Sequence, residues 1–304
     1  MKKTTPKKKT SAKAPEKVKK KPVKKAVAEP VAQVRQPQGR LIGADEPAPA
    51  RVENADGKAK CVIVCDHASN YVPKSLGSLG LSKADLQKHI AWDPGSEDIG
   101  RRLSQGLDAP LIAASYSRLV VDLNRGHDNP ECIRPESDHI RIPGNEGLTD
   151  VQKAHRLDTF FWPYHRVVDT QLQKFLDRGI APALLSMHSF TPEMDGIKRP
   201  WHIGVLWNEE EDIALRLVEN LRRDNPDLRI GENEPYSLKS VNYTKNTIST
   251  HAETRGLPYV IVAFRQDLVD TKQKAYKWAD IFLKSLKPLL DDPGFYHLRA
   301  ERRK

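Results

Sequence analysis

The chain has 304 residues, a formal net charge of +10 and 38% hydrophobic residues, enough for one large or two modest domains with a buried core. The charge is uneven, because residues 1–40 carry 14 lysines and arginines against two acidic residues, while residues 41–304 have an acidic excess of two. The basic character therefore belongs to the N-terminal segment, which argues against a basic nucleic-acid-binding face on the folded part.

Residues 1–50 consist largely of Lys, Pro, Ala, Val and Thr and include no aromatic residue. Such a segment cannot bury enough apolar area to offset its ordering entropy, so we predict a disordered tail over residues 1–50 and a single domain over residues 51–304. Weak contact of residues 1–40 with nucleic acid or another polyanion is one expected role of the tail. A solvated extension with no specific partner is the alternative.

From residue 58 onward, short apolar runs alternate with amphipathic stretches. Nearly continuous apolar runs are typical of strands that helices cover on both faces, so the pattern predicts one α/β domain with a mainly parallel sheet. The predicted strands are 61–65, 110–114, 118–122, 183–187, 202–206 and 259–264. The predicted helices are 83–89, 95–107, 149–177, 210–223, 247–255 and 271–290.

The cysteines and the apolar runs exclude two classes of protein. Three cysteines cannot form a disulfide framework, and Cys61 and Cys65, four apart in an apolar run, are expected to be buried thiols. No apolar run approaches the ~20 residues of a membrane span, and no apolar segment of a secretory signal follows the basic start. We therefore expect a cytoplasmic protein without membrane contact.

Polar motifs follow several of the predicted strands, where ligand sites of parallel sheets lie. His67 follows the first strand and His188 follows the strand 183–187, and two histidines at neighbouring strand ends are typical of a metal pair. Asp93 precedes Pro94 and a predicted helix, so its spacing alone favours a helix N-cap. The long connection 125–148 has no periodicity and is expected to be either a pocket wall or lid, or a surface excursion.

The segment 117–125 carries charge next to a predicted strand. Asp122 and an arginine can form a purely structural pair. Asn124 and Arg125 stand at the end of the predicted strand, where a guanidinium can hold a carboxylate through two hydrogen bonds.

These motifs occur in an order that resembles the N-formylglutamate amidohydrolase family: HASN, AWDPGS, SRLVVDLNR, IPGN, LSMHSFTP, NEPYS and RQDLV, over residues 60–270. The resemblance implies zinc-dependent hydrolysis of a small N-acyl amino acid and a fold similar to that of the zinc carboxypeptidases, a mixed sheet between helices in three layers.

The resemblance also implies roles for individual residues. His67 and His188 match the family's histidine ligands of zinc, and Asp93 is expected to be the third ligand, because the carboxypeptidase position for it holds Asn70 here. Asn124 and Arg125 match the pair that holds a substrate carboxylate. Two further arginines are secondary candidates for contact with the anion, Arg118 and Arg199.

The sequence departs from the family at one catalytic position. Ala263 stands where similar members have the glutamate that activates water, two residues before the arginine of RQDLV. Glu253 and His251 are the candidate substitutes. The leading hypothesis is a zinc amidohydrolase, and the alternative is a weakly active or non-catalytic binder of small anionic molecules with a polyanion-binding tail.

Overall fold

The computed structural model describes residue 1, residues 39–238 and residues 245–302, so the predicted tail lies outside the described residues over positions 2–38. Packing begins before residue 51. Leu41 is buried, and its carbonyl accepts a hydrogen bond from the Ser75 hydroxyl at 2.6 Å. The Tyr116 hydroxyl donates to the Pro47 carbonyl at 2.7 Å. Residues 41–50, which were predicted as part of the tail, therefore pack against the α/β domain through apolar side chains, backbone carbonyls and the Glu46 carboxylate.

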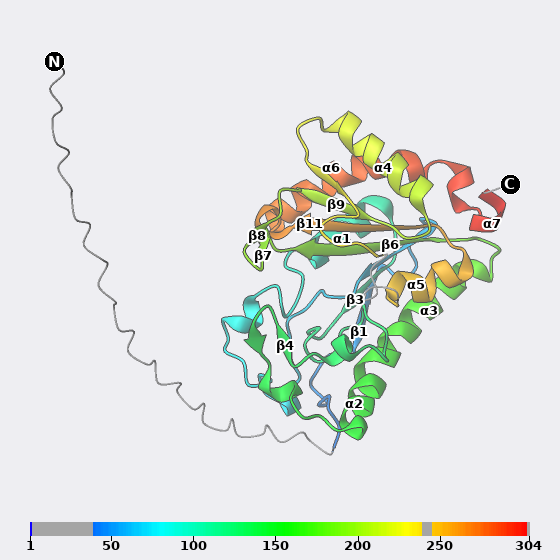
Figure 1. Cartoon of the computed structure of the whole chain (residues 1–304). Coiled ribbons are helices and arrows are strands. Elements are labelled where there is room, and N and C mark those ends of the chain that lie inside the picture. The colour runs from blue at the N-terminus through cyan, green and yellow to red at the C-terminus, as the bar shows by residue number, and fades with distance from the viewer. Residues whose placement is uncertain (2–38, 239–244, 303–304) are drawn as a thin grey trace. The chain divides into compact units, whose positions relative to one another are not determined.

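A seven-stranded mixed sheet forms the middle layer of the domain, in the order β1-β3-β2-β6-β11-β9-β10 (Figure 1). The four strands β3, β2, β6 and β11 run parallel, β1 and β9 are antiparallel to their neighbours β3 and β11, and β10 is parallel to β9. The bounds are β1 (Ala50–Glu53), β2 (Cys61–Cys65), β3 (Leu111–Ala114), β6 (Ala183–Phe190), β9 (Ile203–Leu206), β10 (Ile230–Glu232) and β11 (Tyr259–Arg265).

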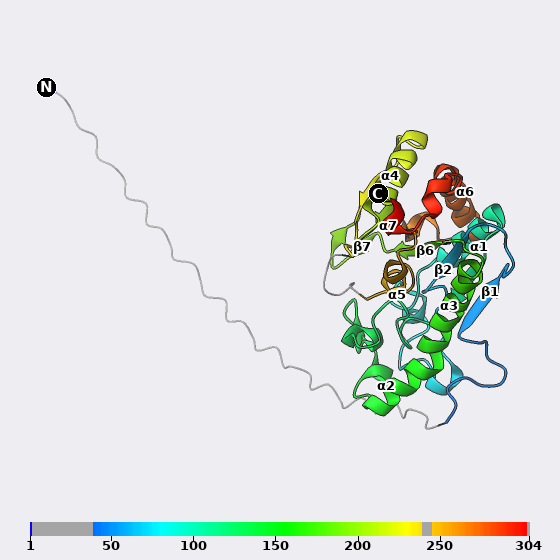
Figure 2. The ribbon, with the colours of Figure 1, turned by 90° about the vertical axis from the view of Figure 1, so that its right-hand side faces the viewer.

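Helices cover both faces of the sheet (Figures 1 and 2). One face carries α1 (Ser96–Leu107), α4 (Glu211–Asp224) and α6 (Lys272–Leu290), and the other carries α3 (Trp162–Leu176) and α5 (Thr247–His251). Alternate residues of β11 enter the two cores, because Ile261 packs toward α3 and α5 whereas Val260 and Val262 pack toward α1, α4 and α6. The predicted three-layer α/β architecture with a mainly parallel sheet is confirmed.

Most predicted elements are present, with shifted ends. The long predicted helix 149–177 consists of α2 (Asp150–Arg156), a π-helical turn (Leu157–Phe161) and α3, and Thr149 caps its start by accepting from the Gln152 backbone N–H. The smaller elements are α7 (Arg299–Arg302), the hairpins β4 (Glu136–Ser137) with β5 (Ile140–Arg141) and β7 (Glu193–Met194) with β8 (Ile197–Lys198), and 3₁₀ turns at Lys74–Leu76, Asp85–Gln87, Pro130–Ile133, Pro143–Asn145, Glu253–Arg255, Gln266–Leu268 and Pro293–Tyr296.

Two predicted elements are wrong. Residues 118–122 form turns instead of a strand, because the Val120 N–H bonds the Ser117 carbonyl, and the apolar residues there are buried without pairing to the sheet. Residues 83–89 contain only the 3₁₀ turn at Asp85–Gln87. The short strands β1 and β10 were not predicted, since β1 is an edge strand with polar residues and β10 has three residues.

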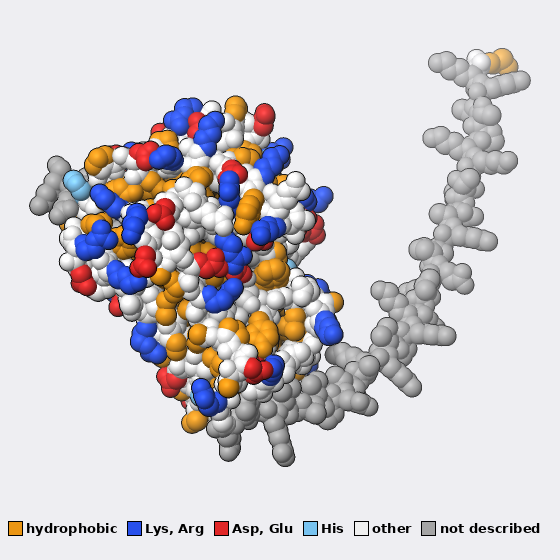
Figure 3. All heavy atoms as spheres, turned by 180° about the vertical axis from the view of Figure 1, so that it is seen from behind, with side chains coloured by type: hydrophobic (Ala, Val, Ile, Leu, Met, Phe, Trp, Pro, Cys, Tyr) orange, Lys and Arg blue, Asp and Glu red, His pale blue; other side chains and the backbone are white. Residues whose placement is uncertain are grey.

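The described residues agree with the expectations for thiols and charge. Cys61, Cys65 and Cys132 are free and buried. No helix in the described residues is long and apolar enough to cross a membrane. Lys and Arg side chains alternate with Asp and Glu over the face seen in Figure 3, as the near-neutral balance of residues 41–304 predicts.

Candidate active site

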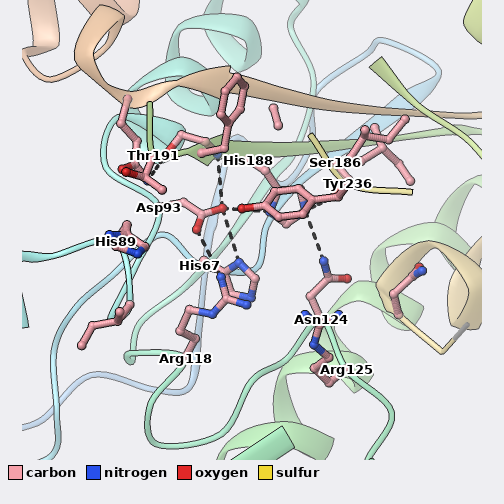
Figure 4. Close-up of a pocket in the computed structure, with 18 of the residues that line it drawn as sticks. His67, His89, Asp93, Arg118, Asn124, Arg125, Ser186, His188, Thr191 and Tyr236 are labelled. Carbon is pink, nitrogen blue, oxygen red and sulfur yellow. Dashed lines mark hydrogen bonds and ion pairs between the residues drawn. The ribbon is translucent and has the colours of Figure 1, made fainter. Parts of the chain in front are cut away.

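His67, Asp93 and His188 meet at the carboxyl ends of two parallel strands (Figure 4). His67 lies two residues after β2, His188 lies near the end of the neighbouring strand β6, and Asp93 lies in the segment before α1. One ligand atom from each of the three lies within 4.8 Å of the other two, and all three side chains are almost fully buried. The two strands therefore bring together the two histidines that the sequence singled out.

The Asp93 carboxylate is the centre of this cluster. Its Oδ2 lies 3.0 Å from His188 Nδ1 and 3.4 Å from His67 Nδ1, and it accepts a hydrogen bond from the Ser189 backbone N–H at 3.2 Å. Arg118 Nη1 lies 3.5 Å from Asp93 Oδ1. Both imidazoles thus turn the same ring nitrogen, Nδ1, toward one carboxylate oxygen.

The opposite ring nitrogens are held by a second set of groups. His67 Nε2 lies 2.7 Å from Asp122 Oδ1, and because a carboxylate only accepts, Nε2–H donates; when the ring is neutral, the Nδ1 lone pair then faces Asp93. His188 Nε2 lies 3.0 Å from Ser186 Oγ. Two acceptors that face each other in a buried site repel unless a proton or a cation lies between them. A carboxylate on the outer nitrogen is the arrangement that orients histidine ligands of zinc.

The charges of the cluster are strongly coupled. Burial by itself raises the pKa of Asp93, but His67 and His188 outweigh it and hold that pKa well below its usual value. Burial and Arg118 oppose the charged form of His67, yet the carboxylates of Asp122 and Asp93 leave its pKa raised. The site therefore favours positive charge between its carboxylates.

Asp93 does not cap the following helix. Gly95 occupies the N-cap position of α1 with φ of 80°, and no side chain caps the helix there. A Cβ at Gly95 would lie 2.3 Å from the Val269 carbonyl oxygen, so this turn requires glycine. The turn leaves the Asp93 side chain free to point at the histidines, and the N-cap interpretation is wrong. Asn70 donates its amide to the Leu86 carbonyl at 2.8 Å and does not line the cavity at the cluster.

A cavity of about 120 Å³ opens beside the three residues. Asn124, Arg125 and Arg118 line it, as do Arg134 and Ser137 from the connection 125–148, which thus forms part of the cavity wall. Arg118 also binds Asp122, through Nε at 3.0 Å. Three guanidinium groups at one wall can attract and orient an anion.

Arg199 does not line the cavity. Its Nη1 donates to the Tyr236 hydroxyl at 2.9 Å, and its guanidinium carbon lies 4.8 Å from the centre of the same ring. Tyr236 lines the cavity, so Arg199 acts on the site through Tyr236.

The structure does not bring Glu253 and His251 to the cluster. Glu253 Oε1 accepts from the Tyr259 hydroxyl at 2.6 Å, at the start of β11, whereas Ala263 lies near the strand's other end. His251 Nε2 lies 2.9 Å from His165 Nδ1, inside the packing of α3 against α5. Neither side chain lines the cavity, because α5 points its Ile248 there.

Ala263 lines the cavity and is paired in register with His188 across β11 and β6. The position at which the sequence resemblance implies a glutamate is therefore at the site, with a methyl group in place of a carboxylate. Three features of the site were not predicted: the outer contact of Asp122 with His67, the lining residue Arg134, and the lining residue His89, whose Nε2 lies 3.3 Å from Asp138 Oδ2. Asp122 was detectable, since it lies in the SRLVVDLNR motif.

Known proteins resemble the chain in sequence and in structure. The family model described as N-formylglutamate amidohydrolase matches residues 59–269. A gene product of Agrobacterium tumefaciens is 30% identical, with a TM-score of 0.77 over 82% of this chain and 99% of that chain. An N-formylglutamate amidohydrolase from Ralstonia eutropha is 16% identical, with a TM-score of 0.56 over 80% of this chain and 97% of that chain. No curated protein matches the chain.

Proposed function

Because the chain belongs to the N-formylglutamate amidohydrolase family, we propose that it hydrolyses the amide bond of a small N-acyl amino acid at a zinc site. His67, Asp93 and His188 would hold the zinc. The observation that carries the proposal is the convergence of both Nδ1 atoms on Asp93 Oδ2, at 3.0 and 3.4 Å. Two nitrogen ligands and one carboxylate are the protein ligand set of many catalytic zinc sites, which keep a further position open.

Zinc at such a site supplies polarisation of the substrate carbonyl and activation of water. Asp122 holds the His67 ring through Nε2, and Ser186 holds the His188 ring in the same way, so both rings present Nδ1 without further rearrangement. Metal affinity should therefore depend on these outer contacts as well as on the three ligands.

Arg125 and Asn124 would orient the carboxylate of the substrate. The Asn124 side chain is itself positioned, because its Oδ1 accepts from the Thr247 backbone N–H at 3.0 Å and its Nδ2 lies 3.4 Å from His188 Nε2. This amide thus links the anion-binding wall to one of the proposed ligands. Arg118 shares its charge with Asp122 and Asp93, so its first role is to neutralise the buried carboxylates.

Ala263 limits the rate that the site can reach. A methyl group neither takes a proton from water nor gives one to the leaving amine, and the loss of a positioned base costs about 100-fold or more. Slow hydrolysis is therefore expected of the natural chain. The same observation favours the second candidate function, an anionic small-molecule binder that keeps the pocket without turnover.

The two functions are separated by an assay of Ala263→Glu. Formate release from N-formyl amino acids should rise at least tenfold, equivalent to about 1.4 kcal/mol of barrier. Ala263→Gln is the matched control, since it adds the same volume without a base, and it should stay at the natural rate. Glu253→Gln should also leave the rate unchanged, because that side chain lies away from the cavity. If both the natural chain and Ala263→Glu are inactive on every amide although zinc is bound, the binder is correct.

A further inference from the structure

Part of the cavity lining is apolar. Leucine and isoleucine side chains from four parts of the chain form this apolar wall: Leu206 on β9, Leu238, Ile248 on α5 and Ile261 on β11. Ile261 is paired in register with Leu206, and the next inward-facing residue of β11, Ala263, is paired with His188. The apolar wall therefore runs from the edge of the cavity to the proposed ligand.

The apolar wall also adjoins the site for the carboxylate. The Thr247 backbone N–H donates to Asn124 Oδ1, and the next residue is Ile248. A ligand whose carboxylate is held at Asn124 and Arg125 thus places its neighbouring atoms within reach of Ile248. The site has charged groups at one end and aliphatic side chains next to them. This arrangement matches an amino acid with a carboxylate and an apolar side chain.

Charge is distributed unevenly around the cavity. The guanidinium groups that line the cavity come from residues 118–134, namely Arg118, Arg125 and Arg134. Among the described residues that line the cavity after position 194, none is charged: Leu206, Tyr236, Leu238, Asn246, Ile248, Ile261, Ala263 and Gln266. A second carboxylate placed against Leu206, Leu238 and Ile248 would lose its hydration and would meet no cation among the described lining residues there, since Arg199 reaches the cavity only through Tyr236.

Resting on the proposed function, we propose that the substrate is an N-acyl amino acid with an apolar side chain, not an N-acyl glutamate. Asn124 and Arg125 hold its α-carboxylate, and Leu206, Leu238 and Ile248 pack against its side chain. Burial of hydrocarbon against this wall favours binding of the apolar side chain. Desolvation of the carboxylate disfavours binding of an acidic side chain of the same shape.

The test compares substrates of matched shape on the zinc-loaded full chain. N-formyl-L-leucine and N-formyl-L-aspartate have side chains of nearly equal shape, and N-formyl-L-glutamate is the family's own substrate class. We measure kcat/KM for those that turn over and the dissociation constant by calorimetry for those that do not. The leucine compound should be favoured at least ~10-fold over both acidic compounds. Equal or stronger preference for either acidic compound overturns the inference alone, whereas no binding and no turnover of any of the three overturns the proposed function as well.

A variant of the apolar wall tests the assigned position of the side chain. Ile248→Ala should shift the preference toward N-formyl-L-phenylalanine over N-formyl-L-leucine by about 10-fold, because the smaller side chain enlarges the cavity beside the apolar wall. Ile203→Ala is the matched control, since Ile203 is equally buried but lies in the core on the other face of the sheet. Ile248→Val removes one methyl group and should have little effect on folding stability. It should shift the preference in the same direction, by a smaller factor. An equal shift in Ile203→Ala, or none in either Ile248 variant, overturns the inference.

Discussion

Two pairs of buried histidines lie in the domain, and they differ in the groups that face them. His67 and His188 turn Nδ1 toward Asp93, and their ring centres are 5.3 Å apart. His165 and His251 bond each other at 2.9 Å, and His165 Nε2 donates to the Leu123 carbonyl. The first pair surrounds a carboxylate, whereas the second is a contact between α3 and α5.

The electrostatic consequence is opposite for His67 and for the second pair. Burial lowers the pKa of His165 and of His251 to about 4, and the neighbouring His251 and Arg255 respectively add to that effect. In His67 the same burial is outweighed by Asp122 and Asp93, and the pKa is raised. Burial of a histidine is therefore a poor indicator of metal binding by itself. The carboxylates around the ring distinguish a potential metal ligand from a histidine in a packing contact.

Removal of one proposed ligand is the strongest test of this comparison. His188→Ala should lower zinc affinity more than ~100-fold, because a three-ligand site loses one of its two nitrogens. His251→Ala removes an equally buried imidazole from the other pair and should retain about one zinc per chain. Elemental analysis of both purified variants measures the zinc content per chain. Full zinc content in His188→Ala would contradict the proposed zinc site.

Asp93→Asn tests the carboxylate at the centre of the first pair. The amide keeps the shape of the side chain and removes its charge, so zinc affinity should fall at least ~100-fold. The melting temperature of the metal-free protein should fall as well, because the amide loses the attraction between the Asp93 carboxylate and both histidines, but the loss of zinc affinity should be the larger effect. The contrary result, retained zinc with a large loss of thermal stability, would return Asp93 to a structural role.

Asp122→Asn tests the outer contact of His67. Loss of an outer carboxylate partner typically costs about 10–100-fold in metal affinity. The effect should therefore be smaller than that of Asp93→Asn and should appear in zinc competition with a chelator. Asp128→Asn is a control with an exposed carboxylate away from the cluster, paired with Lys245, and should leave zinc affinity unchanged. An equal loss in both variants would argue for a general electrostatic effect.

The second pair predicts the pH dependence of stability. Because the folded-state pKa of about 4 lies below the unfolded value near 6.5, the unfolded chain binds more protons between these values. The contribution of the pair is complete above pH 6.5 and is lost as pH falls toward 4, by about 2 kcal/mol for each histidine between pH 7 and pH 5. Urea unfolding in the presence of a chelator should show a shallower loss of stability over this range for His251→Gln than for the natural chain. Identical slopes would mean that the pair is not held neutral by burial.

The sequence by itself determined the class of fold and the two histidines of the site. Apolar runs predicted β2, β6, β9 and β11, and amphipathic spacing predicted α1, α4 and α6, because these patterns report how each element is buried along its own length. His67 and His188 were found because each follows or ends a strand, and the ends of parallel strands meet at one edge of the sheet. Ala263 was located from the RQDLV motif alone.

Only the tertiary structure decided which groups face these histidines. Spacing alone favoured an N-cap for Asp93, yet the positive φ at Gly95 directs the side chain into the cluster. Glu253 and His251 are near Ala263 in sequence. They precede the start of β11, however, whereas Ala263 lies near the other end of the strand. Residues 118–122 are as buried as a strand but do not pair with the sheet. The turns that they form place Asp122 against His67. Periodicity reports burial within one element, whereas these contacts join atoms from segments 26 to 95 residues apart, so their geometry depends on how the layers pack.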